Sequence, residues 1–346
     1  MFCCCGFAAR GPLPAMPLRT ALTEMLGIEH PIIQGGMQYV GYAEMASAVS
    51  NAGGLGILTG LTQPDPEALR AEIRRCQTMT DKPFGVNLTI LPALIPADYD
   101  GYARVLAEEK VALVELAAGS PKKYTPMWKA AGLKVLHKSA TMRHALKAQE
   151  AGVDLIEIVG YEGSIAGGQK GDEVGAWVLL AKATSTLKVP VIAAGAAGTG
   201  RQLAAALAMG AHGITMATRF LCTVEAPIDI KIKETMVRPE NDERQTTIVL
   251  GSLSNATRVF KNEVAQQIRD IEGKGDVDFS QVMPLASGQR TKKMWQQSGD
   301  TSDAMWSCGQ SLGLISDIPT CQELVRRIVQ EAEERLQSSA RMMSKL

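Results

Sequence analysis

Residues 142–159, MRHALKAQEAGVDLIEIV, contain the pattern that decides the fold. An Ala-rich helical stretch, Met142–Ala151, is followed by Gly152 and then by a short apolar run, Leu155–Val159. Glycine directly after a helix accepts the left-handed backbone conformation without Cβ strain. The same junction between a helix and a strand recurs at Ala131-Gly132-Leu133 and, as Met209-Gly210-Ala211, further along the chain. Repetition of one βα unit is the signature of a barrel.

Apolar runs alternate with helical stretches over most of the chain. The expected strands are near-continuous hydrophobic runs, as in parallel strands covered on both faces: Pro31–Gln34, Gly54–Leu58, Phe84–Thr89, Leu113–Ala117, Val135–Lys138, Leu155–Val159, Val191–Ala194 and Gly213–Ala217. The expected helices between them are Tyr42–Asn51, Pro66–Gln77, Tyr99–Glu109, Thr125–Ala131, Met142–Ala151, Ala176–Thr186 and Arg201–Met209. This order predicts an α/β fold, a (β/α)8 TIM barrel. An open doubly wound sheet is the alternative, but it usually has fewer strands and one early nucleotide-binding turn.

The alternation stops after Pro227. We expect helices at Ile228–Arg238 and Val259–Glu272, a polar irregular stretch over Asp276–Gly313, and a long charged helix at Glu323–Met343. The chain is therefore expected to have three parts: residues 1–17 as a disordered leader, 18–235 as the barrel, and 236–346 as a C-terminal helical cap or lid packed over the barrel mouth.

Charge and composition exclude several classes of protein. The 346 residues include 36 basic and 36 acidic side chains, so no basic excess points to nucleic acid or to an anionic membrane. No apolar run is long enough to span a bilayer. Seven cysteines, with no pair at metal-site spacing, suit a reduced compartment and no metal site. We expect a small-molecule substrate and a cytoplasmic location, and we leave a homodimer open.

The first twenty residues, MFCCCGFAARGPLPAMPLRT, contain two arginines and no acidic residue. Three interpretations stay open: a disordered leader before an internal start at Met16, a short mitochondrial transit peptide, or palmitoylation of Cys3-Cys4-Cys5.

Polar residues stand where several expected strands end, which is where barrels of this kind carry their sites. The first strand ends in Gln34-Gly35-Gly36-Met37, whose glycines would let the backbone approach a planar ring closely; a plain tight turn between strand and helix is the alternative. Asn87 on the third strand could hydrogen-bond a flavin carbonyl or its N3–H edge, and a structural Asn that satisfies loop backbone is the alternative. Lys138 on the fifth strand needs an anion nearby, either the N1–C2 edge of a reduced flavin or Glu157 on the next strand. His137 should point away from Lys138.

The last two expected strands are followed by runs of small residues. The seventh leads into Ala194-Gly195-Ala196-Ala197-Gly198-Thr199-Gly200-Arg201, and the eighth into Met216-Ala217-Thr218-Arg219-Phe220. Free backbone N–H groups beside small side chains, with the Thr218 hydroxyl, predict a phosphate cradle. A flexible connection is the alternative for one glycine-rich run, whereas two such loops together are stronger evidence.

Taken together, these segments resemble the nitronate monooxygenase (2-nitropropane dioxygenase-like) family, and within it the NAD(P)H:quinone reductase group. The resemblance covers roughly Leu18 to Met342 and is carried by HPIIQGGM, NAGGLGILTGLTQP, KPFGVNLTILP, KVLHKSATMRHALKA, GRQLAAALAMGAHGITMATRF and SGQRTKKMWQQSGDTSDAMWSCGQSLGLI. It implies bound FMN, with NAD(P)H as a further substrate. The FMN contacts that it implies are Gly36, Met37, Asn87, Lys138, Gly167, Gly168, Ala194, Gly195, Ala196, Ala217 and Thr218.

One departure from the family pattern concerns the catalytic base. The family usually shows a Gly-His pair after the sixth strand, and here that position falls on Gly168 or Gln169. Neutral nitroalkanes need a base to remove the α-proton, and His suits this because its pKa lies near working pH. The catalytic candidates in this chain are Glu162, Gln169 and Lys170, with Glu162 capping a loop as the alternative.

We therefore expect an FMN-dependent oxidoreductase that oxidises an alkyl nitronate with O2 without the usual catalytic His. An NAD(P)H:quinone reductase of the same fold is an alternative, since it needs no base either. An enoyl thioester reductase would need a basic groove for its carrier, and no such cluster is evident in the sequence. A flavin-binding relative with lost or diverted activity is the remaining alternative.

Overall fold

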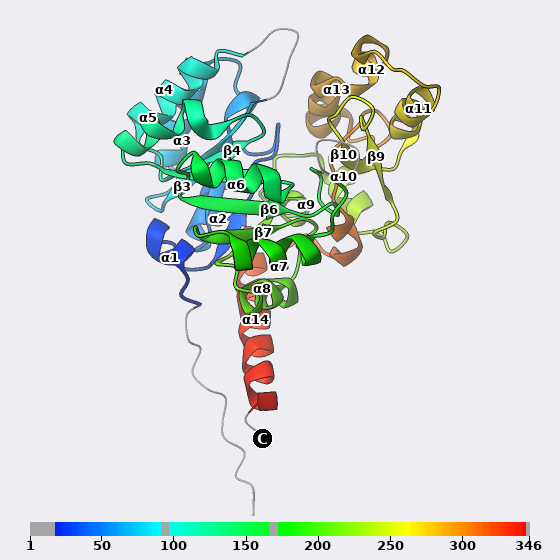
Figure 1. Ribbon diagram of the computed structural model, residues 1–346. Coiled ribbons are helices and arrows are strands. Elements are labelled where there is room, and N and C mark those ends of the chain that lie inside the picture. The colour runs from blue at the N-terminus through cyan, green and yellow to red at the C-terminus, as the bar shows by residue number, and fades with distance from the viewer. Residues whose placement is uncertain (1–17, 91–96, 166–171, 344–346) are drawn as a thin grey trace, which may run out of the picture.

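A barrel of eight parallel strands forms the centre of the molecule, which confirms the predicted TIM barrel (Figure 1). The structure, a computed structural model, describes residues 18–90, 97–165 and 172–343. The strands follow the order β1-β8-β7-β6-β5-β4-β3-β2, and a bridge between Ile33 and Leu55 joins the two ends of this order. Their bounds are β1 Ile32–Gln34, β2 Gly56–Thr59, β3 Phe84–Thr89, β4 Leu113–Ala117, β5 Lys134–Ser139, β6 Leu155–Val159, β7 Val191–Ala194 and β8 Ile214–Met216.

The N-terminal end of the barrel is closed by apolar packing. Helix α1, Ala21–Leu26, contributes Leu22 and Leu26 to a buried cluster with strand residues such as Ile57 and Leu136. Thr20 caps this helix by accepting a hydrogen bond from the amide of Thr23. Because this end is filled, only the C-terminal ends of the strands are left to form a site.

The barrel helices surround the strands much as expected. Their bounds are α2 Ala43–Asn51, α3 Pro66–Gln77, α4 Tyr99–Glu109, α5 Thr125–Ala130, α6 Met142–Glu150, α7 Ala176–Thr186 and α8 Gly200–Ala208, followed by the short α9 Thr218–Leu221 and α10 Ile230–Met236. Single 3-10 turns lie at Gly60–Thr62, Pro121–Lys123 and Gln310–Leu314, and a π-helical turn at Met294–Ser298. Among the described helices, none is long and apolar enough to cross a membrane.

Helix α14, Cys321–Met343, packs against α8 and α2 on the outside of the barrel (Figure 1). These two helices follow β7 and β1, so α14 occupies the place of the eighth barrel helix. A Cβ at Gly200 would lie 2.2 Å from the carbonyl oxygen of Ile328, so only glycine permits this close packing. Glu331 of α14 also accepts a hydrogen bond from the Gly200 amide at 2.9 Å. The expectation that the whole C-terminal third lies over the mouth is therefore wrong for α14.

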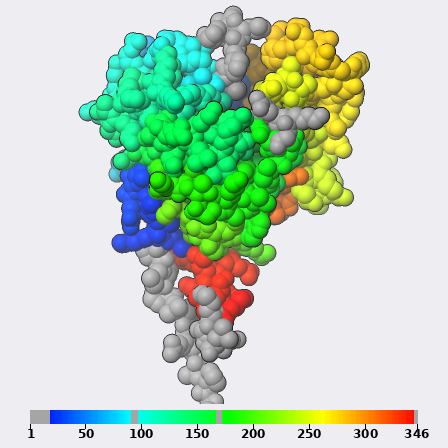
Figure 2. Space-filling view, in the orientation of Figure 1, coloured from blue at the N-terminus to red at the C-terminus, as the bar shows by residue number. Residues whose placement is uncertain are grey.

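The chain between the barrel and α14 forms a small unit of its own. It contains an antiparallel pair, β9 Thr246–Val249 and β10 Thr257–Phe260, and the helices α11 Glu263–Glu272, α12 Phe279–Ala286 and α13 Gly288–Lys293. The prediction of a helix beginning at Val259 is therefore wrong at its start, because Val259 and Phe260 belong to β10 and the helix begins at Glu263. The stretch expected to be irregular from Asp276 contains two helices. In the space-filling view the yellow and orange unit stands beside the green barrel, at the opposite end from α14 in red (Figure 2).

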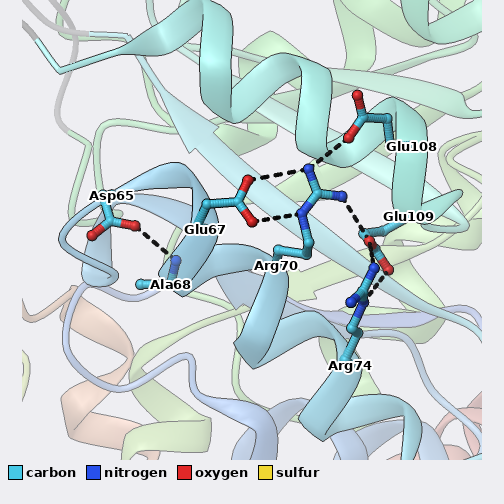
Figure 3. A network of polar contacts seen from close by, with 7 residues as sticks. All are labelled: Asp65, Glu67, Ala68, Arg70, Arg74, Glu108 and Glu109. Carbon is cyan, nitrogen blue, oxygen red and sulfur yellow. Dashed lines mark hydrogen bonds and ion pairs between the residues drawn. The ribbon is translucent and has the colours of Figure 1, made fainter.

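Arginine and glutamate side chains join α3 to α4 on the surface (Figure 3). Arg70 of α3 pairs with Glu67 at 3.0 Å, and it reaches Glu108 at 2.6 Å and Glu109 at 2.8 Å on α4. Arg74 contacts Glu109 at 2.8 Å. Glu109 is largely buried between the two arginines, and several charges act together here, so the network fixes how the two helices lie.

A first test concerns the contact between α2 and β2. A Cβ at Gly56 would lie 1.9 Å from the carbonyl oxygen of Ala46, so Gly56→Ala must push the helix off the strand. We expect the free energy of unfolding to fall by about 1–3 kcal/mol or more, measured by urea denaturation. Gly251→Ala is the matched control, because nothing lies within 4 Å of its added Cβ. Equal effects of the two substitutions would contradict the packing described here.

Candidate active site

A buried ion cluster lies inside the barrel near the C-terminal ends of its strands. The Lys138 ammonium is 3.0 Å from Oε1 of Glu115 and 3.2 Å from Oε1 of Glu157. The carboxylates come from β4 and β6, on either side of β5, and their side chains are 1 % exposed. The Lys138 side chain is 10 % exposed. The alternative interpretation of Lys138, that it pairs with Glu157, is confirmed, and Glu115 is a second partner.

Donors from three further strands complete the cluster. Asn87 of β3 donates to Oε2 of Glu115 at 2.7 Å, and the amide of Gly36, just after β1, donates to the same oxygen at 3.1 Å. Thr215 of β8 donates to Oε2 of Glu157 at 2.9 Å. The Asn87 orientation is set by Thr89, whose hydroxyl donates to Oδ1 of Asn87 at 3.0 Å. Each carboxylate thus accepts at least one hydrogen bond in addition to its ion pair with Lys138.

Burial and charge set the protonation of this cluster. Burial raises the pKa of Glu157 to about 7, Lys138 opposes that rise, and the negative charge of Glu115 adds to it. Burial alone would lower the pKa of Lys138, but the two carboxylates outweigh it and hold that pKa above its usual value. Lys138 therefore stays charged, while Glu157 can change its protonation state near neutral pH.

The loop after β1 lies tightly against neighbouring strands. A Cβ at Gly36 would lie 2.5 Å from Cβ of Asn87, so the space left by this glycine is filled by the asparagine side chain. Met37 is fixed by Thr59, whose Oγ1 accepts from the Met37 amide at 2.9 Å and donates to its carbonyl at 3.0 Å. Gly36 stays partly exposed, and a Cβ at its neighbour Gly35 would lie 3.4 Å from Nζ of Lys138. Contact of Gly36 and Met37 with a ring remains a prediction.

The loops after β6, β7 and β8 converge at this end of the barrel. Gly195 has a φ of 104°, and a Cβ there would lie 2.6 Å from the amide nitrogen of Gly160. Its neighbour Ala196 has a φ of 55°, a left-handed conformation that is uncommon for residues other than glycine. Gly309 joins them, because its amide donates to Oγ1 of Thr218 at 3.0 Å. The two loops predicted to form a cradle are therefore neighbours in space.

Part of the predicted cradle is already occupied by the protein. Oε1 of Gln202 accepts from the amides of Gly198 at 2.8 Å and Thr199 at 3.2 Å, so these two amides cap α8 and are not available to a ligand. Within residues 18–90, 97–165 and 172–343, no group accepts a hydrogen bond from the amides of Gly195, Ala196 or Ala217. The donors available for a phosphate are thus fewer than the sequence suggested.

The candidates for a catalytic base are only partly described. The Glu162 carboxylate accepts from the amide of Ala176 at 2.8 Å with one oxygen and 3.1 Å with the other. It caps the start of α7, which is the alternative interpretation of this residue. Gly167, Gly168, Gln169 and Lys170 lie outside the described residues. The catalytic role of Glu162, Gln169 or Lys170 remains a prediction.

The four histidines of the chain lie away from the ion cluster. His137 is buried and its Nδ1 is 2.9 Å from the hydroxyl of Ser139; burial lowers its pKa. His212 accepts from the amide of Ala21 at the closed end of the barrel. The pKa of His30 and that of His144 are also lowered by burial. Among the described residues, no imidazole faces the mouth as a base.

The sequence reasoning missed Glu115, Thr215 and Arg258. Arg258 of β10 donates to the carbonyl of Tyr161 at 3.0 Å and lies 5.2 Å from the centre of its ring, which fixes the loop after β6. The signal for Glu115 was present, because a single acid interrupts the apolar run Leu113–Ala117 as Glu157 interrupts Leu155–Val159. Nothing in the sequence around Arg258 indicates its role, because its partner Tyr161 is 97 residues away.

Comparison with known proteins fits this architecture. The family model of nitronate monooxygenase matches residues 19–107 and 91–331. The chain belongs to the nitronate monooxygenase family. It is accordingly an oxidoreductase enzyme.

Its relatives within this family differ in their named activities. A (3aS,4S,5R,7aS)-5-hydroxy-7a-methyl-1-oxo-octahydro-1H-indene-4-carboxyl-CoA dehydrogenase of Rhodococcus jostii (strain RHA1) is 32% identical, covering 92% of this chain and 97% of the relative. A nitronate monooxygenase of Pseudomonas aeruginosa is 28% identical, covering 89% of this chain and 98% of that protein. The solved structure of FabK from Thermotoga maritima is 35% identical with a TM-score of 0.84, covering 93% of this chain and 98% of FabK.

Removing the cation at the centre of the cluster gives a second test. Lys138→Met leaves two buried carboxylates without a counter-charge, so we expect a loss of about 3–5 kcal/mol of unfolding free energy near pH 8. The loss should shrink as the pH falls, because protonation removes the buried charge. Urea denaturation at several pH values measures both effects.

Lys82→Met is the control for this substitution. Lys82 makes an exposed pair with Glu29 at 3.5 Å, and its loss should change stability by less than about 1 kcal/mol at any pH. A Lys138→Met protein as stable as Lys82→Met would show that the cluster is not a tightly held ion pair.

Proposed function

We propose that this enzyme binds FMN at the mouth of the barrel and oxidises an alkyl nitronate with O2 without a histidine base. The observation that carries the proposal is the Lys138 ammonium, held at the strand ends and still 10 % exposed there. When bound, FMN supplies the redox chemistry, because it can take electrons from a substrate and pass them on. A nitronate is already an anion, so no residue of this chain needs to remove its α-proton.

The residues at the mouth fit such a cofactor. Lys138 would stabilise negative charge on the N1–C2 side of the ring, and Asn87, beside it, would hold the ring edge. The uncapped amides of Gly195, Ala196 and Ala217, with the Thr218 hydroxyl, would hold the phosphate. Thr218 already accepts from Gly309, which leaves its own O–H free to donate. Ala194 would lie beneath the phosphate, with Gly36 and Met37 on the β1 side.

A second candidate function is oxidation or reduction of a CoA thioester. It is favoured by the Rhodococcus relative, which is named as an indene-4-carboxyl-CoA dehydrogenase and shares more identity with this chain than the Pseudomonas nitronate monooxygenase does. An NAD(P)H:quinone reductase is a third candidate. A homodimer and a cytoplasmic location also remain proposals.

Anaerobic reduction of the bound flavin separates these functions. The purified protein should be yellow, and we expect an alkyl nitronate to bleach it while the parent neutral nitroalkane does not, because no imidazole is at hand to deprotonate the latter. Readmission of O2 should restore the colour with O2 uptake. Bleaching by NADH or NADPH alone, or by an acyl-CoA alone, would select the reductase or the thioester enzyme. A colourless protein that FMN cannot reconstitute would refute the flavin assignment.

The phosphate cradle can be tested through Thr218. Thr218→Val removes one hydrogen bond to a charged group, so we expect FMN affinity to fall about tenfold while riboflavin affinity changes little. Thr218→Ser, which keeps the hydroxyl, should bind FMN nearly as wild type. Equal losses for FMN and riboflavin in the Val variant would show that Thr218 only supports the Gly309 loop.

A further inference from the structure

The ion cluster contains more negative charge than Lys138 can balance. Two carboxylates, Glu115 and Glu157, lie within 3.2 Å of one ammonium, and all three side chains are at least nine-tenths buried. With both acids ionised the cluster carries one net negative charge next to the site proposed for the flavin. Reduction of that flavin would add another. A proton on one of the two acids would relieve this repulsion.

The hydrogen-bond partners decide which acid can take the proton. Oε2 of Glu115 faces the Gly36 amide and the Asn87 side-chain amide, which can only donate; a proton on that oxygen would meet two donors. Glu157 faces the hydroxyl of Thr215, which can donate to a carboxylate or accept from a carboxylic acid. Glu157 can therefore be protonated without leaving an unsatisfied group.

We propose that Glu157 takes up one proton from solvent when the bound flavin is reduced and releases it when the flavin is reoxidised. This inference rests on the proposed function, because it requires FMN beside Lys138. Glu157 acts through Lys138: as it becomes neutral, the ammonium is freed from one carboxylate and can turn its charge to the reduced ring. It is a positioning residue and does not itself touch the flavin.

The surroundings of Glu157 support this assignment. The charged groups that face it are Lys138 of β5 and Glu115 of β4, and Thr215 of β8 supplies the hydroxyl. The neighbouring strand β7, Val191–Ala194, has no titratable side chain. Burial places the pKa of Glu157 at about 7, so a modest added negative charge is enough to protonate it near neutral pH.

The step is balanced in electrons and protons. Two electrons and one proton enter the flavin, supplied by the reductant and by solvent, and one further proton passes from solvent to a carboxylate oxygen of Glu157. On reoxidation both protons return to solvent. Two protons are therefore taken up for two electrons, whereas a fixed charge beside the anionic reduced flavin would allow only one.

The test is the pH dependence of the midpoint potential of the FMN-loaded protein, titrated anaerobically with indicator dyes between about pH 5 and pH 9. In the wild type, the slope of midpoint potential against pH should correspond to one proton per two electrons at the acidic end. Above a pH near the pKa of Glu157, that slope should double to two protons per two electrons. Glu157→Gln should show one proton per two electrons throughout. Glu115→Gln is the matched control: it should keep the doubled slope but move it to lower pH, because it removes the charge that raises the pKa of Glu157.

A wild-type slope of one proton at every pH, or a doubled slope that persists in Glu157→Gln, would overturn the proposal. If Glu157→Gln does not bind FMN, the proposal is tested on the wild type alone, by its reduced-minus-oxidised infrared difference spectrum near pH 8. A carboxylic-acid carbonyl band should appear on reduction and shift in D2O, and its absence would refute the proton uptake. A protein that binds no flavin would instead refute the proposed function on which this inference rests.

Discussion

The ammonium of Lys138 between two buried carboxylates is the interaction on which the candidate site depends. Through Glu115 and Glu157 it joins β4, β5 and β6, and through Gly36, Asn87 and Thr215 it reaches the β1 end, β3 and β8. Buried ion clusters seldom add to stability, because the desolvation of each charge offsets most of the attraction. What this cluster provides is a fixed position for a positive charge at the mouth of the barrel. Apolar side chains could close the same space, but they could not hold a cation there.

The sequence predicted the barrel well because each strand carries its own signal. The bounds of β3, β4, β6 and β7 agree with the apolar runs, and those of α3, α4 and α7 with the helical stretches. The parts that it missed depend on partners distant in sequence. The pairing of Asn87 with Glu115 follows from the parallel register of neighbouring strands. The four-residue strands β9 and β10 are too short for periodicity to reveal, and the place of α14 is set by packing on α8.

Family membership fixes the fold and the class of chemistry more firmly than the substrate. Relatives of comparable coverage are named as a nitronate monooxygenase and as an indene-4-carboxyl-CoA dehydrogenase, although both align with nearly the whole chain. The ion cluster lies inside the barrel near the strand ends, and the proposed function assigns it to the cofactor and not to the substrate. Discrimination must come from groups further out, and in a barrel these belong to the loops after the strands.

The small unit contacts the loops at the strand ends. Its strand β10 bridges the loop after β6 at Ile165, and the Arg258 side chain holds Tyr161. The segment that follows it closes the other side, since Gln310 donates to the carbonyl of Glu162 and Gly309 to Thr218. The loop that would carry the family's base is therefore anchored by residues that come long after it in the chain. Because α14 completes the barrel ring on the outside, the small unit lies outside that ring and contacts the barrel through the loops at the strand ends.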